Sequence, residues 1–420
     1  MSWTKPIVHD FMKPSACGVA THQWEEAGVL MNAEEQPTAT KGPLSGLVVA
    51  DLSRVLAGPY CTMLLADMGA TVIKVESPGG DDTRAWRPPE HDGVSTYFMS
   101  INRNKRAIAL DFNDQQDIQT VYDIIGRADV LVENFKPGGL EKFGLDPERV
   151  AQRWPELVHA TITGFGTTGG ASMPGYDLLA QAVSGMMTLT GEPDGEPQRA
   201  GVAIFDVMTG LHAALGIMGA LRDRSVTGQG QHIGVNLLSS ALSGMVNQTV
   251  GYAAGGSVPM RMGNDHPSLF PYGPLMASDS YIVICCGNEA QFGRLVTSLG
   301  SPELAEDLRF NSMVNRNAHR ETLRELLEED LKKKTSQEWF DILQAQGIPC
   351  SPILNVGEGI EFAQNLGLDP IVQAGPAESS TPTIKHPVTY SRSTISYDQS
   401  PPAIDADRQR ILQWLESTIN

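Results

Sequence analysis

Short apolar runs alternate with amphipathic segments over the first half of the chain. Leu47–Leu52 is apolar enough for a buried strand, residues 60–68 have helical spacing and stop at Gly69, and Thr71–Val75 is a second strand-like run. Together these segments form one βαβ unit of about 30 residues. The alternation continues with predicted strands at 107–110, 129–133, 157–163 and 231–235, and predicted helices at 115–125 and 147–154.

This alternation predicts an α/β fold with a Rossmann-like parallel sheet covered by helices. In such sheets ligands bind at the carboxyl ends of the strands. The loops that follow the strands, at 53–59, 76–84, 111–114 and 134–144, should therefore share one edge and form the binding site.

The second half of the chain has a different pattern. We predict a linker helix over 237–261, a smaller inserted α+β domain over 262–345, and a return segment, 346–420, that completes the large domain begun at 43–236. Residues 1–42 show no clear period and are predicted to be an N-terminal extension.

Composition narrows the classes of partner. The chain has 420 residues and a net charge of −18, which disfavours nucleic acid and anionic membranes as partners but allows a small anionic ligand. The five cysteines and nine histidines have no metal-ligand spacing, so we expect no metal. No uninterrupted apolar run approaches about 20 residues, and no targeting signal is recognisable. These features predict a cytoplasmic or mitochondrial-matrix protein that does not span a membrane.

A single carboxylate, Asp206, interrupts a run of apolar and small residues that extends from Gly201 to Leu221. Burying an ionised group is costly unless it is paired, solvated or needed for chemistry. Two interpretations follow from the run alone. Asp206 caps a helix N-terminus, or it is a catalytic carboxylate.

Three further motifs leave alternatives open. Gly164–Gly169 reads GxGxxG after a strand, but no helix opens there, so a flexible active-site turn is favoured over a dinucleotide site. The basic cluster Asn102–Arg106 is a solvated loop or a phosphate clamp. Glu133–Gly139 offers an amide, an aromatic ring, a cation and glycines, and it favours ligand contact. Asp177 begins another apolar run and has the same two interpretations as Asp206.

The ordered set of motifs resembles the class III CoA-transferases, the formyl-CoA transferase/carnitine CoA-transferase family. The likeness is carried by Leu52–Pro59, Ala66–Glu76, Gly80–Arg84, Asn102–Arg106, Val132–Phe135, Thr163–Gly166 and Phe205–Gly210. It extends from about Pro43 nearly to the C-terminus. Arg261–Tyr272 and Gly287–Phe292 resemble the branch that transfers CoA between succinyl-CoA and dicarboxylates such as hydroxymethylglutarate or glutarate.

The resemblance implies an enzyme in which Asp206 is a nucleophile that forms an aspartyl-CoA thioester. The donor would be an acyl-CoA such as succinyl-CoA, and the acceptor a dicarboxylate such as glutarate or itaconate. It implies an interlocked homodimer and no tightly bound cofactor, with coenzyme A entering as part of the substrate. The CoA contacts implied by the family are Leu56, Ala57, Arg106, Leu110, Asn113, Asn134, Phe135, Lys136, Lys142, Tyr176 and Asp177.

Arg261, Asn264 and His266 cluster where the dicarboxylate branch differs from its relatives. They are our candidates for binding the distal carboxylate of the acceptor. The alternative function within the family is an α-methylacyl-CoA racemase with Asp177 as base. Racemases typically have Gly-His-Asp where this chain has Gly175-Tyr176-Asp177, which disfavours that alternative.

Overall fold

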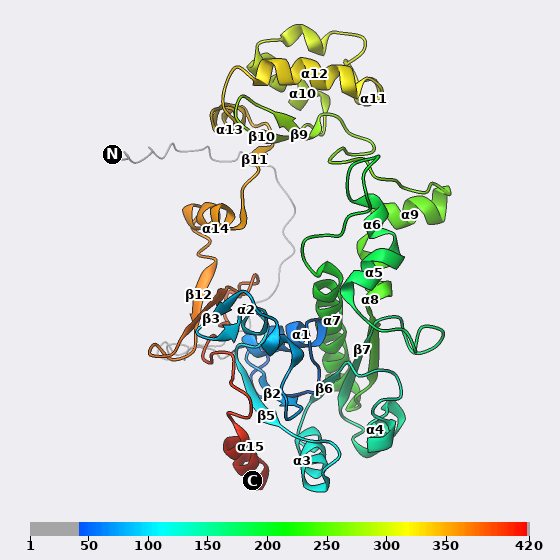
Figure 1. The fold of residues 1–420 in the computed structure, drawn as a ribbon, viewed down its shortest axis with the longest axis vertical. Helices are drawn as coiled ribbons and strands as arrows, with labels where there is room; N and C mark the ends of the chain where they lie inside the picture. Colours follow the sequence, from blue (N-terminus) through cyan, green and yellow to red (C-terminus); the bar gives the residue numbers. More distant parts are fainter. Residues whose placement is uncertain (1–41, 418–420) are drawn as a thin grey trace, which may run out of the picture. The chain divides into compact units, whose positions relative to one another are not determined.

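The large domain is built on one parallel six-stranded sheet (Figure 1). The computed structural model describes residues 42–417, so all but the last residue of the predicted N-terminal extension lies outside the described residues. The strand order is β5 (Lys105–Ala109), β2 (Thr71–Glu76), β1 (Val48–Asp51), β6 (Val130–Glu133), β7 (Val158–Thr163) and β8 (His232–Asn236). The predicted Rossmann-like fold is confirmed. The order reverses between β1 and β6, where such sheets form a ligand crevice.

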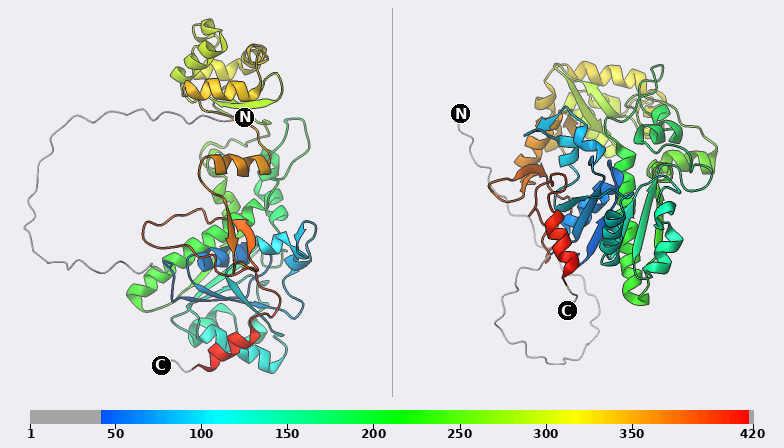
Figure 2. Two further views of the ribbon diagram at one scale, coloured as in Figure 1. Left: turned by 90° about the vertical axis from the view of Figure 1, so that its left-hand side faces the viewer. Right: turned by 60° about the horizontal axis from the view of Figure 1, so that its bottom comes forward.

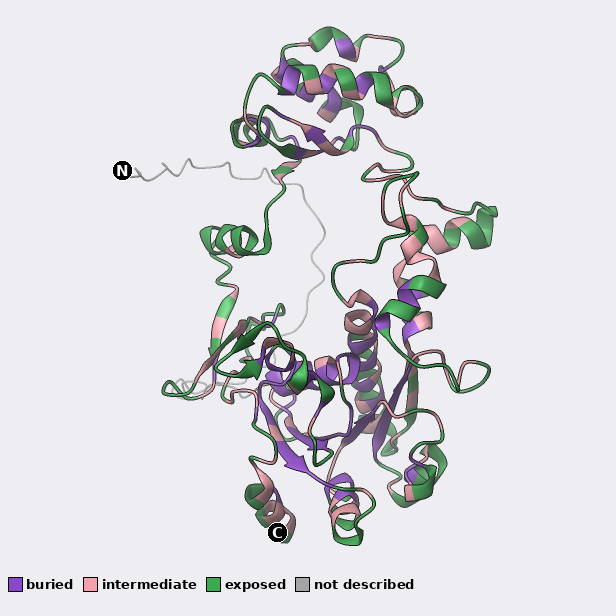
Figure 3. Ribbon diagram, viewed as in Figure 1, coloured by how far each residue is buried: buried purple, intermediate pink, exposed green. Residues whose placement is uncertain are grey.

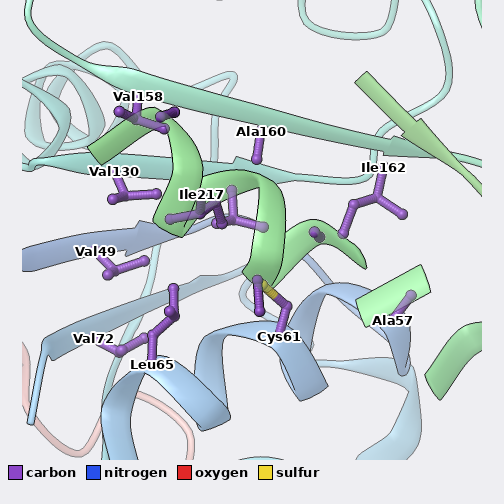
Figure 4. Close-up of a cluster of buried hydrophobic side chains, with 14 of the residues drawn as sticks. Val49, Ala57, Cys61, Leu65, Val72, Val130, Val158, Ala160, Ile162 and Ile217 are labelled. Carbon is purple, nitrogen blue, oxygen red and sulfur yellow. The ribbon is translucent and has the colours of Figure 1, made fainter. Parts of the chain in front are cut away.

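Alternate residues of the strands point to the two faces of the sheet, and each face has its own buried core. On one face α1 (Ala57–Asp67) and α7 (Ile204–Thr227) cover the strands, and Ile217 of α7 lies over the sheet while Cys61 and Leu65 extend from α1 (Figure 4). The opposite face is covered by α3 (Gln115–Gly126), α4 (Pro147–Arg153) and α15 (Arg408–Glu416). Figure 2 shows α3 and α15 on the same side of the sheet, and buried residues concentrate along the strands (Figure 3).

Helix α7 is long and apolar. Among the described residues it is long and apolar enough, with a mean hydropathy of 1.6, to meet a length and composition criterion for a membrane span. Its buried positions, which include Phe205, Ala213 and Ile217, pack against α1 and the sheet.

The predicted linker helix is two helices. α8 (Leu237–Gly244) ends at Met245, and α9 (Val246–Gly255) starts with Val246 at φ +40°, which breaks the helical path. α8 packs with α7 and α5 (Asp177–Ser184), so it belongs to the core of the large domain. The polar N-cap Asn236 accepts a hydrogen bond from Ser239 N–H at 2.8 Å, which fixes the start of α8.

The smaller domain has an α+β core of its own, as predicted. An antiparallel sheet of β9 (Tyr272–Met276), β10 (Tyr281–Cys285) and β11 (Cys350–Pro352) packs with α10 (Glu289–Leu299), α12 (Arg320–Leu331) and α13 (Ser336–Ala345). Because β11 pairs with β10, this sheet extends beyond the boundary predicted at residue 345. The other domain boundaries stay predictions.

Shorter elements complete the described chain. They are α2 (Thr96–Met99), α6 (Met186–Leu189), α11 (Met313–Ala318), α14 (Val356–Asn365), β3 (Glu90–His91), β4 (Val94–Ser95), β12 (Ile371–Ala374), β13 (Thr381–Ile384) and the 3-10 turns Asp82–Ala85, Glu141–Phe143 and Pro302–Ala305.

The return segment fastens onto the edge strand β5. The Asp405 carboxylate accepts the Ala109 N–H at 2.9 Å, and the Asp407 carboxylate accepts the Ala107 N–H at 3.0 Å. The Asp407 N–H in turn donates to the Ala107 carbonyl at 3.0 Å. Because β5 is at the edge of the sheet, no neighbouring strand pairs with these N–H and carbonyl groups, and the return segment does so instead.

The basic cluster runs into β5, and its residues 102–105 are buried while Arg106 is partly exposed, which corrects both interpretations offered for it. Arg103 donates to both carboxylate oxygens of Asp67, at 2.9 and 2.5 Å. Lys105 Nζ donates to Asp51 at 3.1 Å and to the Pro59 carbonyl at 2.9 Å. The cluster is therefore neither a solvated loop nor a phosphate clamp, because Arg103 and Lys105 tie α1 and β1 to the edge of the sheet.

Candidate active site

A cleft of about 1220 Å³ opens at the carboxyl ends of the strands. Its walls are the loops after β1, β2, β5 and β6, together with residues 173–176, Asp206 and Leu237. The prediction that these loops share one edge is confirmed. The volume exceeds the range of about 300–1,000 Å³ typical of pockets for drug-sized ligands, which suits an extended substrate.

Asp206 is the third residue of α7, so it is not the N-cap of that helix. The N-cap position is Ala203, whose side chain makes no capping bond. The cap comes from another helix, because the Asp177 carboxylate accepts the N–H groups of Phe205 at 2.8 Å and of Asp206 at 3.1 Å. Asp177 therefore fixes the backbone that carries Asp206.

The carboxyl group of Asp206 is an unpaired acid at the wall of the cleft. Within residues 42–417 no group donates a hydrogen bond to it. Burial, followed by repulsion from the Asp177 carboxylate, raises the pKa of Asp206 to about 7. An ionised carboxylate with little solvation is a stronger nucleophile than one in water.

Asp177 is fully engaged in this support. Besides the two backbone N–H groups, it accepts a hydrogen bond at 2.5 Å from Gln181 Nε2, and Gln181 Oε1 accepts the Ala200 N–H at 2.8 Å. Both carboxylate oxygens of Asp177 thus accept hydrogen bonds from the protein. This arrangement speaks against Asp177 as the base of a racemase.

The start of α1 lies against α7 one turn beyond Asp206. A Cβ added at Gly210 would lie 2.6 Å from the Ala57 carbonyl oxygen, so only glycine permits this approach. The N-cap residue of α1, Leu56, makes no side-chain capping bond. Leu56 and Ala57, at the start of α1, line the same cleft as the Asp206 carboxyl group.

Tyr97 of α2 was not singled out from the sequence. Burial and then the nearby Asp206 carboxylate raise the pKa of its hydroxyl to about 12, and Asp177 and Asp81 add to the effect. Its ring packs edge-on against Trp86, which lines the cleft, at 5.0 Å between centroids. Tyr97 remains a protonated hydrogen-bond donor near the acid.

The structure brings most of the predicted CoA contacts together. Those that line the cleft are Leu56, Ala57, Leu110, Asn113, Asn134, Phe135, Lys136 and Tyr176. Lys142 lies beside it, with Nζ 3.5 Å from Asn113 Oδ1, and Asp177 lies behind Asp206. Arg106 is the second residue of β5, four residues before Leu110, and outside the cleft lining.

The three candidates for acceptor binding are not part of the cleft lining in the described chain. Arg261 donates to the carbonyl groups of Glu192 at 3.1 Å and Gly195 at 2.8 Å. His266 packs edge-on against Tyr272, and its Nδ1 accepts the Ser268 N–H. The Asn264 backbone lies against Gly273. Their role stays a prediction.

Several cleft residues escaped the sequence analysis. Arg54, Val55, Asp81, Arg84 and Trp86 all line the cleft. None of them was named as a candidate, although Arg54, Val55, Asp81 and Arg84 lie in Leu52–Pro59 and Gly80–Arg84, two of the motifs that carry the family likeness. Within residues 42–417, no three His, Cys, Asp or Glu side chains cluster in a way that could hold a metal ion.

Comparison with known proteins gives a consistent answer. Residues 44–408 match the family model described as CoA-transferase family III. A succinate–glutarate CoA-transferase from Agrobacterium fabrum is 38% identical, over 90% of this chain and 96% of its own length. An acetyl-CoA:oxalate CoA-transferase from Acetobacter aceti is 39% identical, over 81% and 88%. A CAIB/BAIF family crystal structure from Brucella suis superposes with a TM-score of 0.82 at 41% identity, covering 90% of this chain and all of the other.

Proposed function

The chain belongs to CoA-transferase family III, and on that premise we propose that it transfers CoA from an acyl-CoA to a carboxylic acid through a covalent thioester on Asp206. The observation that carries the proposal is the Asp206 carboxyl, which lies in the cleft, receives no hydrogen bond from any described residue, and has its pKa raised to about 7. An acid in this environment is ionised for a large fraction of the time near neutral pH, and it is then poorly solvated and reactive.

The transfer proceeds by exchange of acyl groups at Asp206. Its carboxylate attacks the thioester carbonyl of the donor, and the C–S bond breaks. CoA departs as the thiolate, and the acyl group remains on Asp206 as a mixed anhydride. The thiolate then attacks the Asp206 carbonyl, which releases the donor acid and forms the aspartyl-CoA thioester. The acceptor carboxylate reverses these steps and leaves as the new acyl-CoA. Holding the thiolate beside the anhydride and excluding water favour transfer over hydrolysis.

The cleft supplies groups for each part of the substrate. Lys136 and Arg54 line the cleft and suit the phosphates of CoA, and Phe135 offers an aromatic face. N–H groups at the start of α1 suit the oxyanion that forms when the thioester carbonyl is attacked. Asp177, through its bonds to the first turn of α7, keeps the nucleophile in place.

The names of the relatives support a donor and a class of acceptor. The enzyme from Agrobacterium fabrum is named for succinate and glutarate, which supports succinyl-CoA as donor and a dicarboxylate such as glutarate or itaconate as acceptor. The relative from Acetobacter aceti is named for acetyl-CoA and oxalate, so acceptor selectivity varies among chains of this similarity. A panel of dicarboxylates incubated with succinyl-CoA, with each new thioester identified by mass, determines the acceptor.

A homodimer is part of the proposal. Apolar side chains of α7 and α9 are exposed in the described chain, among them Leu215 at 71%, Val250 at 60% and Tyr252 at 62%. Apolar patches of this kind mark protein interfaces, and a second copy of the chain is the partner implied by the family. Light scattering should report a dimer, and Leu215→Glu should weaken it.

We assign the enzyme to a reducing compartment, the cytoplasm or the mitochondrial matrix. Cys61 and Cys286 are buried among apolar side chains, and burial raises the pKa of Cys286 to about 12. Thiols of this kind persist where disulfides do not form. Fractionation of the source cells tests the assignment.

Trapping the intermediate tests the mechanism. Incubation with succinyl-CoA should add the mass of CoA to the peptide that contains Asp206, and borohydride should reduce this thioester. Asp206→Ala should abolish both the adduct and turnover while retaining the fold. Normal turnover by that variant would exclude the mechanism, and loss of turnover with the adduct on another residue would reassign the nucleophile.

A further inference from the structure

The loop between β1 and α1 is held by side chains at almost every peptide group. The Ser53 N–H donates to Asp51 at 3.0 Å, and its carbonyl accepts from Lys74 Nζ at 3.0 Å. Asn134, which follows β6, accepts the Arg54 N–H at 3.0 Å and donates to the Arg54 carbonyl at 2.7 Å. A loop bound at consecutive donors and acceptors has little freedom to move.

Val55, the next residue, has a strained backbone that these hydrogen bonds hold in place. Val55 has φ +70°, in the left-handed region that β-branched residues rarely adopt. Such strain persists only where the surroundings enforce it, and it concentrates at functional sites. The Val55 N–H faces the Asp81 carboxylate, 3.3 Å from the nearer oxygen. Asp81 therefore holds the strained peptide itself.

Asp81 is in turn fixed by a buried ion pair. Its carboxylate lies 2.9 Å from Lys74 Nζ, and neither side chain is exposed. Thr83 donates to the other carboxylate oxygen from its N–H at 3.0 Å and its hydroxyl at 2.7 Å. Burial alone would raise the pKa of Asp81, but Lys74 and Thr83 hold it below its ordinary value. Buried ion pairs contribute little to net stability, so a role in specifying geometry is their best-attested use.

The strained turn sets the position of the part of the cleft lining that the start of α1 contributes. Val55 leads directly into Leu56 and Ala57, where α1 begins, and the Ala57 carbonyl touches α7 at Gly210. A change of φ at Val55 would swing the start of α1 relative to the nucleophile. Displacement of about 1 Å at a reacting centre costs on the order of a hundredfold in rate.

We infer that Asp81, paired with Lys74, is a positioning residue for acyl transfer: it holds the strained Val55 peptide and thereby fixes the start of α1 relative to Asp206. The inference rests on the proposed function, because it concerns the same thioester chemistry. Asp81 does not itself react.

The test compares two buried carboxylates that differ in what they hold. Asp81→Asn removes the charge that anchors the Val55 turn. Asp67→Asn is the matched control, because Asp67 is equally buried and paired with Arg103 but does not line the cleft. We expect Asp81→Asn to slow formation of the CoA adduct at saturating acyl-CoA by about tenfold or more, while Asp67→Asn slows it less than about twofold per folded molecule.

A second substitution separates positioning from general damage. Glycine adopts φ +70° without strain. The double variant Val55→Gly/Asp81→Asn should therefore form the CoA adduct at least about three times faster than Asp81→Asn alone. The same substitution in the Asp67→Asn background should recover nothing. If Asp81→Asn does not fold, Lys74→Met/Asp81→Asn, which leaves no unpaired buried charge, takes its place with the same expectation.

The outcomes are distinguishable. A wild-type enzyme that forms no CoA adduct overturns the proposed function. A wild-type enzyme that forms the adduct, with Asp81→Asn matching its rate or no recovery by Val55→Gly, overturns the positioning role alone.

Discussion

Replacing Asp206 with asparagine should make the protein more stable while it removes the nucleophile. The side chain is nearly the same size, so the main change is the loss of a carboxylate that the fold solvates poorly. Burial and the Asp177 charge both penalise the ionised form of Asp206. The neutral asparagine amide would carry no such penalty, and its shape fits the same place in the first turn of α7.

The pKa gives the magnitude. Asp206 titrates at 3.8 in an unfolded chain and at about 7 in the folded protein. This difference of about three pH units corresponds to roughly 4 kcal/mol, at about 1.4 kcal/mol each. Because the pKa of this acid is raised by folding, ionisation of Asp206 lowers the free energy of unfolding. This loss is absent below about pH 4, grows as pH rises, and is complete above about pH 7. The asparagine amide forgoes some hydration, so the observed gain should be about 2–4 kcal/mol at about pH 8.

The assay is urea unfolding of both proteins at several pH values between about 4 and 8. We expect the stability difference to grow in favour of the variant through this range and to level off above about pH 7. Asp82→Asn is the control, since the Asp82 side chain is 53% exposed and pairs with Arg54 at the surface. Its effect should stay within about 0.5 kcal/mol at every pH. An Asp206→Asn protein no more stable than wild type at about pH 8 would refute the reasoning.

Four further results are expected. The rate of acylation of wild-type enzyme should rise with pH through about 7 and then level off, because only ionised Asp206 attacks; a rate constant that does not change with pH would contradict this. Asp177→Ala should cost about 1–2 kcal/mol in urea unfolding, since α7 loses its cap, and should lower kcat. Gly210→Ala should lower the free energy of unfolding by about 1–3 kcal/mol, because the added methyl group would collide with the Ala57 carbonyl. At Gly293 nothing lies within 4 Å of an added Cβ, so Gly293→Ala should raise the free energy of unfolding by about 0.5–1 kcal/mol, as measured by thermal unfolding. Lys136→Ala should raise the KM for acyl-CoA several-fold at low salt and less at high salt, with kcat unchanged.

The sheet and the location of the cleft were predictable because they follow from local patterns. Apolar runs at 47–52 and 157–163 have the length and composition of buried strands, and parallel strands place the following loops at one edge. Each of these inferences needs only neighbouring residues and a general rule of topology.

The pairing of charges was not predictable, because the partners lie far apart in the sequence. Arg103 pairs with Asp67, 36 residues away, and Lys105 pairs with Asp51, 54 residues away. The residues next to Arg103 and Lys105 give no sign of these buried ion pairs, so the local sequence has the pattern of a basic loop. Asp206 was ambiguous for the same reason. The residue that caps its helix is Asp177, 29 positions earlier, and no local pattern connects the two.

The attachment of residues 405 and 407 to β5 has a consequence for how the chain folds during synthesis. β5 is an outer strand of the sheet, and its exposed N–H groups are satisfied by the last twentieth of the chain. Until those residues leave the ribosome, the strand is open to pairing with another molecule. The side-chain carboxylates of Asp405 and Asp407 therefore cover a strand edge that would otherwise favour aggregation. A protein truncated before residue 405 should accumulate as insoluble material even though its cleft residues are all present.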